Sequence, residues 1–304
     1  MRVHVKVPAS TANLGPGFDA LGLALALYNE IEASESDAVT FTIQGEGADR
    51  LAGNERNVVA RGVRMAYEEA GRPFRGCHLS CVNRIPLARG LGSSAAAWVG
   101  GLVAGNALLG APLDRTALLA LAARAEGHPD NVAAALLGGL TVACAGPAGA
   151  RATSLPVPPG LRWIVLVPEV SSGTAEARAA LPTSVPHADA VFNVQRVALL
   201  LASLQTGRVD LLPSAFADRL HQPYRARLFP WMAAVAEAAL AEGALGCVLS
   251  GAGPSLLAVV GEDAKTAAVG RAMEEAMRRT GVGGVARELA VDTRGAVSRV
   301  VDPG

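Results

Sequence analysis

The stretch Ile85-Pro-Leu-Ala-Arg-Gly-Leu-Gly-Ser-Ser-Ala-Ala-Ala97 lies between a strand-like segment and an Ala-rich helical segment that begins near Ser93. Gly90 and Gly92 lack a Cβ, so the backbone there can adopt positive φ and approach a ligand closely. The unpaired N–H groups and the positive dipole end of the following helix favour an anion. The hydroxyls of Ser93 and Ser94 suit a helix cap or a Mg²⁺ ligand. The stretch therefore predicts a phosphate-binding loop.

This loop differs from two common nucleotide-binding motifs. No Gly-Lys-Ser/Thr follows its glycines, so it is not a Walker A loop, and it is not the dinucleotide fingerprint Gly-x-Gly-x-x-Gly. For the bare Gly-Leu-Gly-Ser-Ser, a strand–turn–helix with a serine cap is an equally good interpretation. The longer run, apolar–Pro–x–small–x–Gly–Leu–Gly–Ser–Ser–Ala–Ala, is more specific.

The bulk composition bounds the class of protein. A chain of 304 residues can bury a sizeable core in one large unit or two lobes. Lys+Arg and Asp+Glu both number 27, which argues against nucleic acid or an anionic membrane as the main partner. The most apolar stretch, 95–109, is shorter than the roughly 20 residues of a membrane span. Residues 1–7 begin as a strand and not as a signal peptide, and the four cysteines form no Cys-x-x-Cys pair, so we expect a cytoplasmic protein with reduced, buried thiols.

Strands and helices alternate along the chain, with paired strands in each half. The expected strands are 3–7, 22–34, 39–44, 79–82, 163–167, 247–260 (two strands and a turn) and 285–291, the first three forming a meander. The expected helices are 57–70, 93–109, 114–125, one capped by 171–178, 188–204, 209–216, 229–242 and 262–279. A Gly- and Pro-rich hinge is expected at 146–160 and a charged loop at 218–225. This pattern predicts a two-lobed α+β architecture, with lobes at 1–150 and 151–304.

Residues 8–19 are expected to form a loop, which is rich in Gly and Pro but also carries side chains that can bind a small polar ligand. These are Ser10, Thr11, Asn13 and Asp19. A long turn with Asx caps is the alternative interpretation of the segment.

The hexapeptide Glu126-Gly-His-Pro-Asp-Asn131 places two carboxylates, an imidazole and an amide between two helical segments. A structural role accounts for the Gly as a C-cap and for Pro-Asp-Asn as a helix start. It does not account for an acid at the negative end of a helix dipole. A bound cation would reverse that disadvantage.

The full loop motif resembles the ATP-binding signature of the GHMP small-molecule kinases, and every position of that signature is filled. The resemblance extends along the chain, because 8–19 looks like the first motif in its homoserine kinase form, Thr-Ala-Asn-Leu-Gly-x-Gly-Phe-Asp. Further segments that match this subfamily in order are 126–131, 174–178, 218–225 and 249–255. The Gly-Glu-His element of galactokinases and mevalonate kinases is absent, as is the Pro-Ala-Lys-x-Asn start of diphosphocytidyl-methylerythritol kinases. The resemblance implies an N-terminal nucleotide-binding lobe and a C-terminal ferredoxin-like α/β lobe.

The resemblance also implies ATP-dependent phosphorylation of the hydroxyl of L-homoserine to O-phospho-L-homoserine, a step toward threonine. Asn57 would contact adenine, and Mg²⁺ would be held by Ser94 (or Ser93) with Glu126. Arg89 would either reach phosphate or point into solvent. The ATP-binding loop would comprise Pro86, Leu87, Ala88, Arg89, Gly90, Leu91, Gly92, Ser93, Ser94, Ala95 and Ala96.

Homoserine is a zwitterion, so its site needs an anion binder and a cation binder. By the resemblance, Arg178 and Arg225 would hold the carboxylate, since arginine offers a bidentate fork. Asp19 would receive the ammonium group. The remaining substrate contacts would be Asn13, Asn131, Thr174 and Gly251.

Phosphoryl transfer depends mainly on positioning and on neutralising charge. The expected catalytic residues are Asn131, Asp130 and Arg178. Asp130 either acts as general base or is fixed structurally while the hydroxyl proton passes to the γ-phosphate, and His128 is an alternative base. The competing functions are a GHMP kinase for another small alcohol and a non-catalytic nucleotide-binding protein. A homodimer is common in the family, but nothing in the sequence indicates one.

Overall fold

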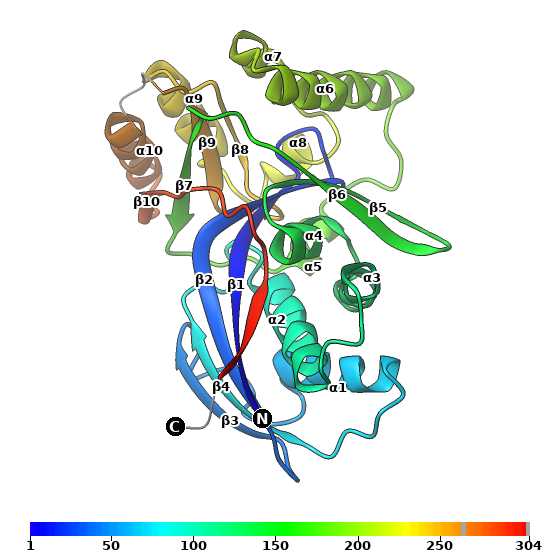
Figure 1. Ribbon diagram of the computed structural model, residues 1–304. Helices are drawn as coiled ribbons and strands as arrows, with labels where there is room; N and C mark the ends of the chain where they lie inside the picture. The colour runs from blue at the N-terminus through cyan, green and yellow to red at the C-terminus, as the bar shows by residue number, and fades with distance from the viewer. Residues whose placement is uncertain (263–265, 302–304) are drawn as a thin grey trace.

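The first of two β-sheets is built around the long strands β1 (Arg2–Ala12) and β2 (Leu21–Glu35) in the computed structural model, which describes residues 1–262 and 266–301. Its strands run in the order β11-β1-β2-β4-β3, and β5 extends from β2 to pair with β6 (Figure 1). The other strands are β3 (Thr40–Gly45), β4 (Cys77–Asn83), β5 (Leu140–Gly146), β6 (Gly149–Leu155) and β11 (Val297–Val301).

The two halves of β1 have different surroundings. In the first half Val3, Val5 and Val7 are fully buried and alternate with more exposed residues, as expected for a sheet with one covered face. From Pro8 to Ala12 every residue is buried. The prediction that 8–19 is a loop is therefore wrong for its first five residues, because pairing with β2 continues to the end of the strand.

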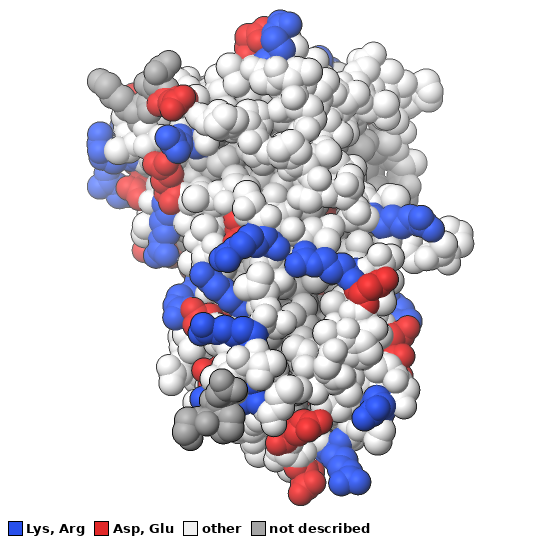
Figure 2. Space-filling view, viewed as in Figure 1, with Lys and Arg blue, Asp and Glu red and all other residues white. Residues whose placement is uncertain are grey.

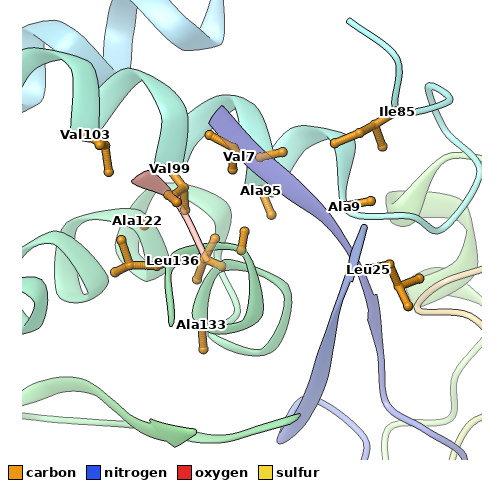
Figure 3. Close-up of a cluster of buried hydrophobic side chains, with 14 of the residues drawn as sticks. Val7, Ala9, Leu25, Ile85, Ala95, Val99, Val103, Ala122, Ala133 and Leu136 are labelled. Carbon is orange, nitrogen blue, oxygen red and sulfur yellow. The ribbon is translucent and has the colours of Figure 1, made fainter. Parts of the chain in front are cut away.

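Helices α1 (Val58–Glu69), α2 (Ser93–Leu108), α3 (Arg115–Glu126) and α4 (Asp130–Leu137) follow in sequence and lie together against the first sheet (Figure 1). Helix α2 is apolar nearly all round, which fits its position between β1 and the other helices. Figure 3 shows small side chains filling this contact, with Val99 of α2 near Val7 of β1. The expected helices 57–70, 93–109 and 114–125 are confirmed.

Helices α1 and α2 approach each other closely because glycines line their contact. A Cβ at Gly101 would lie 2.2 Å from the carbonyl oxygen of Val59, and one at Gly62 would lie 3.0 Å from the carbonyl oxygen of Trp98. The contact therefore excludes even a methyl group at these positions.

The second sheet has the antiparallel order β10-β7-β9-β8, with α9 and α10 packed against it. Its order along the chain is β-α-β-β-α-β, which confirms the expected ferredoxin-like unit. Its elements are β7 (Arg162–Pro168), β8 (Gly246–Leu249), β9 (Leu256–Val260), β10 (Gly284–Glu288), α9 (Met232–Ala241) and α10 (Thr266–Arg279). Between β7 and β8 lie α5 (Thr174–Ala179), α6 (His187–Thr206), the 3₁₀ turn η1 (Val209–Leu211), α7 (Leu212–Ala215) and α8 (Gln222–Arg225).

Four expectations about the connections and strand ends are wrong. The first three strands do not form a meander, because the helical crossover through α1 pairs β3 parallel with β4 instead of with β2. Residues 149–155 of the expected hinge form β6, which pairs with β5. The expected loop 218–225 ends in the short helix α8, and the last expected strand stops at Glu288.

The pairing of β11 was not anticipated. This strand returns from the second half of the chain to the first sheet, where Val301 pairs with Arg2 and Val297 with Lys6. The division into lobes at 1–150 and 151–304 stays a prediction, but the pairing places β6 and β11 in the first sheet.

Charged side chains are interspersed with many uncharged ones on the face shown in Figure 2, where several basic residues cross the middle. Within the described ranges, no helix has the length and apolar character to cross a membrane. All four cysteines are free thiols, and Cys77 and Cys81 are buried. Cys144 is exposed, so the expectation of buried thiols is wrong there.

We expect Gly101→Ala to lower the free energy of unfolding by about 2 kcal/mol, because the overpacking cost at the α1–α2 contact exceeds the gain in helix propensity. Urea unfolding followed by circular dichroism measures this change. Gly270→Ala in α10 is the matched control, since its new Cβ would meet a side-chain methyl, Cβ of Ala286, at 3.3 Å. Equal stability changes in the two variants would contradict the close backbone contact.

Candidate active site

The glycines of the loop between β4 and α2 have the backbone conformation that the sequence predicts. Gly90 and Gly92 have φ of +73° and +67°. A Cβ at Gly90 would lie 2.2 Å from the carbonyl oxygen of Ser250, and one at Gly92 would lie 2.1 Å from Oγ of Ser10. Gly92 itself is the N-cap of α2 and makes no side-chain cap. The serine-cap interpretation is therefore wrong, and the first N–H groups of α2 lie beside the loop for an anion.

Four groups hold the loop in place. Its carbonyl oxygens at Ala88, Gly90 and Leu91 accept hydrogen bonds from Ser172 N, Ser250 Oγ and Ser10 N at 3.1, 2.7 and 3.1 Å. The Arg89 guanidinium donates to the carbonyl oxygens of Leu87, Pro168 and Glu169. Arg89 thus ties the loop to the end of β7, an arrangement that neither sequence interpretation anticipated.

Two cavities meet at this loop and share Ala88, Ser93, Ser94 and Thr174. The first is mainly apolar, and its walls include Ile43, Leu51, Val58, Val59, Leu87 and Ala97 together with Asn57. The second is polar and gathers all of the predicted substrate and catalytic residues. Its walls include Asn13, Asp19, Gly90, Gly92, Glu126, His128, Asp130, Asn131, Arg178, Arg225 and Gly251.

Asn57 lies in the wall of the apolar cavity, but its amide already has two local partners. Its Oδ1 accepts from Val59 N and caps α1, and its Nδ2 donates to the carbonyl oxygen of Ala52. One N–H of the amide is left for a ligand. Of the other predicted loop residues, Pro86, Ala95 and Ala96 are not in either wall, and Ala95 and Ala96 are fully buried.

Ser94 and Glu126 are brought together from the start of α2 and the end of α3. Ser94 Oγ donates to Glu126 Oε2 at 2.7 Å. Burial raises the pKa of Glu126, and this effect outweighs the hydrogen bond from Ser94 and the charge of His128. A cation beside the carboxylate would relieve that cost. The described residues hold no cluster of three or more His, Cys, Asp or Glu suited to a metal, so these oxygens would be completed by ligand and water oxygens.

The start of α4 presents Asp130 and Asn131 to the same cavity. Oδ1 of Asp130 lies 2.7 Å from His128 Nδ1 and accepts from the Asn131 backbone N–H at 2.7 Å. Burial lowers the pKa of His128, but the hydrogen bond and charge of Asp130 outweigh it, so the net shift is upward. Ser10 Oγ donates to Oδ1 of Asn131 at 2.9 Å and thereby fixes the direction of that amide.

Asp19 and Arg178 form a bidentate ion pair, with nitrogen–oxygen distances of 3.0 and 2.7 Å. The hydrogen bonds that its guanidinium donates to Asp19 raise the pKa of Arg178. The expected separation of an ammonium-binding Asp19 from a carboxylate-binding Arg178 is therefore not the arrangement in this structure, where each already faces the other.

Arg225 is almost completely buried, with 2% of its surface exposed. Its guanidinium donates to the carbonyl oxygens of Ala177 and Gly251 and lies 3.1 Å from His221 Nδ1. Burial, and then the charge of Arg178, lower the pKa of Arg225 to about 10. Among residues 1–262 and 266–301 no carboxylate hydrogen-bonds to this guanidinium, which makes it the strongest candidate for an anion.

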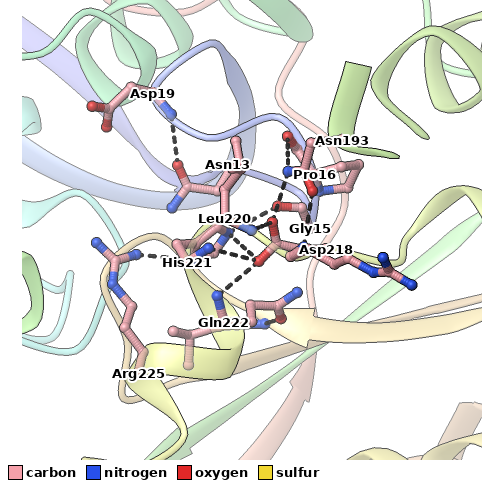
Figure 4. Close-up of polar contacts among 12 residues, drawn as sticks. Asn13, Gly15, Pro16, Asp19, Asn193, Asp218, Leu220, His221, Gln222 and Arg225 are labelled. Carbon is pink, nitrogen blue, oxygen red and sulfur yellow. Dashed lines mark hydrogen bonds and ion pairs between the residues drawn. The ribbon is translucent and has the colours of Figure 1, made fainter. Parts of the chain in front are cut away.

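Asn13 connects the first-motif turn, which is formed by residues 13–19 after β1, to the second sheet. Its Nδ2 donates to the Gly251 carbonyl oxygen at 2.8 Å. Its Oδ1 accepts from the Asp19 backbone N–H at 3.0 Å, as Figure 4 shows. Asn13 and Asp19 have φ of +71° and +56°, a conformation that asparagine and aspartate tolerate better than most residues. Thr174, the first residue of α5, lies in the walls of both cavities.

Family models identify the two halves of the chain. The model for the GHMP kinases N terminal domain matches residues 57–139, and the model for the GHMP kinases C terminal matches residues 200–279. Together they cover more than half of the sequence. The chain belongs to the GHMP kinase family.

Homoserine kinases are among the relatives of this GHMP kinase. It is 46% identical to a homoserine kinase of Moorella thermoacetica over 96% of this chain and 98% of that protein. It is 42% identical to a homoserine kinase of Deinococcus radiodurans, with 96% and 95% covered. The crystal structure of a homoserine kinase from Cytophaga hutchinsonii superposes with a TM-score of 0.88 at 32% identity, covering 98% and 97% of the two chains.

The kinase fold also brings residues to the site that sequence reasoning did not single out. Ser250 holds the loop, and the fully buried His221, four residues before Arg225, contacts its guanidinium. His221 lies inside the matched segment 218–225. Its role as a link between Gly15 and Arg225 is visible only from the tertiary contacts of its ring. The partners of Ser250 come from sequence positions about 160 and 239 residues away, which no local pattern signals.

We expect the imidazoles of His128 and His221 to titrate on opposite sides of the usual pKa of 6.5 in the Mg²⁺-free protein. Neighbouring carboxylates raise the pKa of His128, whereas burial lowers that of His221. Proton NMR titration of the ring signals, assigned with H128N and H221N variants, measures both. A higher pKa for His221 than for His128 would contradict the contacts described above.

Proposed function

We propose that this GHMP kinase is a homoserine kinase, which transfers the γ-phosphoryl group of ATP to the side-chain hydroxyl of L-homoserine. The observation that carries the proposal is the pair of adjoining cavities at the glycine-rich loop. One cavity is apolar and suits a nucleobase. The other contains a buried arginine that has no carboxylate partner among the residues that the structure describes, and an acidic residue lies in the same wall. The similarity to homoserine kinases over nearly the whole chain supports the same substrate.

ATP would place its adenine in the apolar cavity and its triphosphate over the loop. The N–H groups of Gly90 to Ser94 and the N-terminus of α2 would receive the phosphates, since they lie where the two cavities meet. Asn57 would contribute the N–H of its amide that is left, because Oδ1 caps α1 and the other N–H donates to the carbonyl oxygen of Ala52.

Glu126 and Ser94 would hold Mg²⁺ together with phosphate oxygens. The contact between Ser94 and Glu126 supports Ser94 over Ser93 as the hydroxyl ligand. Burial raises the pKa of Glu126, and a bound cation would offset that cost of burying the charged carboxylate. When bound, the ion would neutralise charge that develops on the transferred phosphoryl group.

Homoserine would bind in the polar cavity with its carboxylate on Arg225. Its ammonium group would lie against Asp19, whose pairing with Arg178 would loosen or be shared when substrate enters. Arg178 would then contribute to the carboxylate site or approach the transferred phosphoryl group. Thr174 and the Gly251 backbone would complete the walls.

The homoserine hydroxyl would lie near Asn131, whose amide Ser10 orients. The homoserine hydroxyl oxygen would bond to the γ-phosphorus while the bond from that phosphorus to the bridging oxygen of ADP breaks. We assign the hydroxyl proton to a phosphoryl oxygen, because Oδ1 of Asp130 is already engaged by His128 and by the start of α4. Asp130 would act as a positioning residue.

The free thiols are consistent with a cytoplasmic location.

The substrate class is tested by coupled ADP release with Mg·ATP against L-homoserine, L-serine, mevalonate, galactose and shikimate. We expect kcat/KM for L-homoserine to exceed that for mevalonate, galactose and shikimate by at least about 100-fold, because each of these lacks one or both of the charged groups that the site pairs. L-serine carries both groups but is one methylene shorter, so we expect a smaller preference, of about tenfold or more, because its hydroxyl would stop short of the phosphoryl group. Turnover of another alcohol alone would overturn the proposal but keep the kinase family. Binding of ATP without turnover of any alcohol would indicate a non-catalytic protein.

We expect Glu126→Gln to lower kcat by about 100-fold or more, because an uncharged amide is a weak Mg²⁺ ligand. The same ADP-release measurement at rising Mg²⁺ concentration should show a higher Mg²⁺ requirement. Glu169→Gln, at the far side of Arg89, is a matched control, since only its backbone oxygen is used there. Unchanged activity of the Glu126 variant at saturating Mg²⁺ would remove this residue from the metal site.

A further inference from the structure

Arg225 uses three of its five N–H groups inside the protein. Nε donates to the Ala177 carbonyl oxygen at 3.2 Å, and Nη1 faces both the Gly251 carbonyl oxygen and His221 Nδ1 at 3.1 Å. In the part of the chain that the structure describes, Nη2 makes no hydrogen bond. Since Arg225 lies in the wall of the polar cavity, its two Nη2–H groups are the donors left for a ligand.

The contacts of His221 specify its protonation and tautomer. Nε2 lies 2.8 Å from the Gly15 carbonyl oxygen, which can only accept, so Nε2 must carry the hydrogen. Nδ1 lies 3.1 Å from Nη1 of Arg225, which can only donate, so Nδ1 must be unprotonated. The imidazole therefore bridges the first-motif turn and the guanidinium, as Figure 4 shows.

The ring itself is held rigidly. It is fully buried and stacks on Phe18, with centroids 5.2 Å apart. The same Phe18 ring lies beneath the guanidinium groups of Arg178 and Arg225, at 5.6 and 5.4 Å. Asp218 accepts from the backbone N–H groups of His221 and Gln222 and so fixes the start of α8.

The charges around the ring keep it neutral on balance. Burial and the facing Arg225 charge lower the pKa of His221, and they outweigh Asp218, whose Oδ2 lies 3.5 Å from Nε2, and the more distant Asp19. A proton on Nδ1 would set two donors against each other at the Arg225 contact.

We propose that His221 is a positioning residue for substrate binding, whose unprotonated Nδ1 holds the Arg225 guanidinium so that Nη2 faces the carboxylate of the substrate. This inference rests on the proposed function. A wider consequence is that the anion site depends on an acceptor that never touches the ligand. Substrate affinity would therefore be set partly by the turn at Gly15, to which the same ring is bonded.

Two substitutions separate the two hydrogen bonds of His221. H221N can place an amide oxygen near the position of Nδ1 and keep the acceptor for Arg225, whereas H221Q can place an N–H near the position of Nε2 and keep only the bond to Gly15. We expect H221Q to raise KM for L-homoserine about tenfold, the loss of roughly one hydrogen bond to a charged group. KM for ATP should stay within about twofold, and H221N should stay within about threefold of wild type in both constants.

Tyr224→Phe is the control for a change in the helix that His221 caps, because the Tyr224 hydroxyl is not among the partners of Arg225. The inference would be overturned if H221Q raised KM for homoserine and KM for ATP equally, or if it left KM for homoserine unchanged. A tenfold increase of KM for homoserine in a folded H221N would also overturn it. If a thermal melt shows that H221Q does not fold, H221L takes its place in the comparison with H221N. H221L should then raise KM for homoserine about tenfold and leave KM for ATP within about twofold. A wild-type protein that does not phosphorylate homoserine would overturn the proposed function itself, independently of these comparisons.

Discussion

The structure depends on fixing the carbonyl oxygens of one short loop so that its N–H groups can face a ligand. Gly90 and Gly92 turn the backbone where there is no room for a side chain, and the two sheets supply the groups that hold it. Ser10 belongs to β1 of the first sheet, whereas Ser250 precedes the β8–β9 turn of the second. The loop is thus a junction at which both halves of the molecule meet, and neither half alone would keep its conformation.

The polar cavity illustrates how buried charge is made tolerable. Arg225 has no carboxylate partner in the described ranges, but backbone carbonyl oxygens, an imidazole and an aromatic face surround it. Such neutral partners satisfy hydrogen bonds without cancelling the charge, so a desolvated cation is left for an incoming anion. Asp19 and Arg178 solve the same problem differently, by pairing with each other at the more exposed side of the cavity.

Much of this arrangement could be predicted from sequence because it depends on local patterns. The positive φ of the loop glycines and the helices expected at 57–70, 93–109 and 114–125 follow from short-range rules. The ferredoxin-like order of the second half is implied by the family resemblance and not by a local pattern. The pairing of Asp19 with Arg178 could not be predicted, because the two residues lie far apart in the sequence. The family resemblance assigns each of them to a different charged group of the substrate instead of to each other. The roles of His221 and Arg89 also depend on contacts across the fold, with backbone atoms that carry no sequence signature.

The return of β11 to the first sheet has a consequence for how the chain can fold during synthesis. Strand β1 leaves the ribosome before the other strands of its sheet, yet one of its two neighbours is formed by residues 297–301. Until these residues emerge, one side of β1 presents unpaired backbone groups to other chains. The N-terminal sheet is therefore completed late, and a nascent chain stalled beyond β10 would be a target for chaperones despite having nearly all of its core.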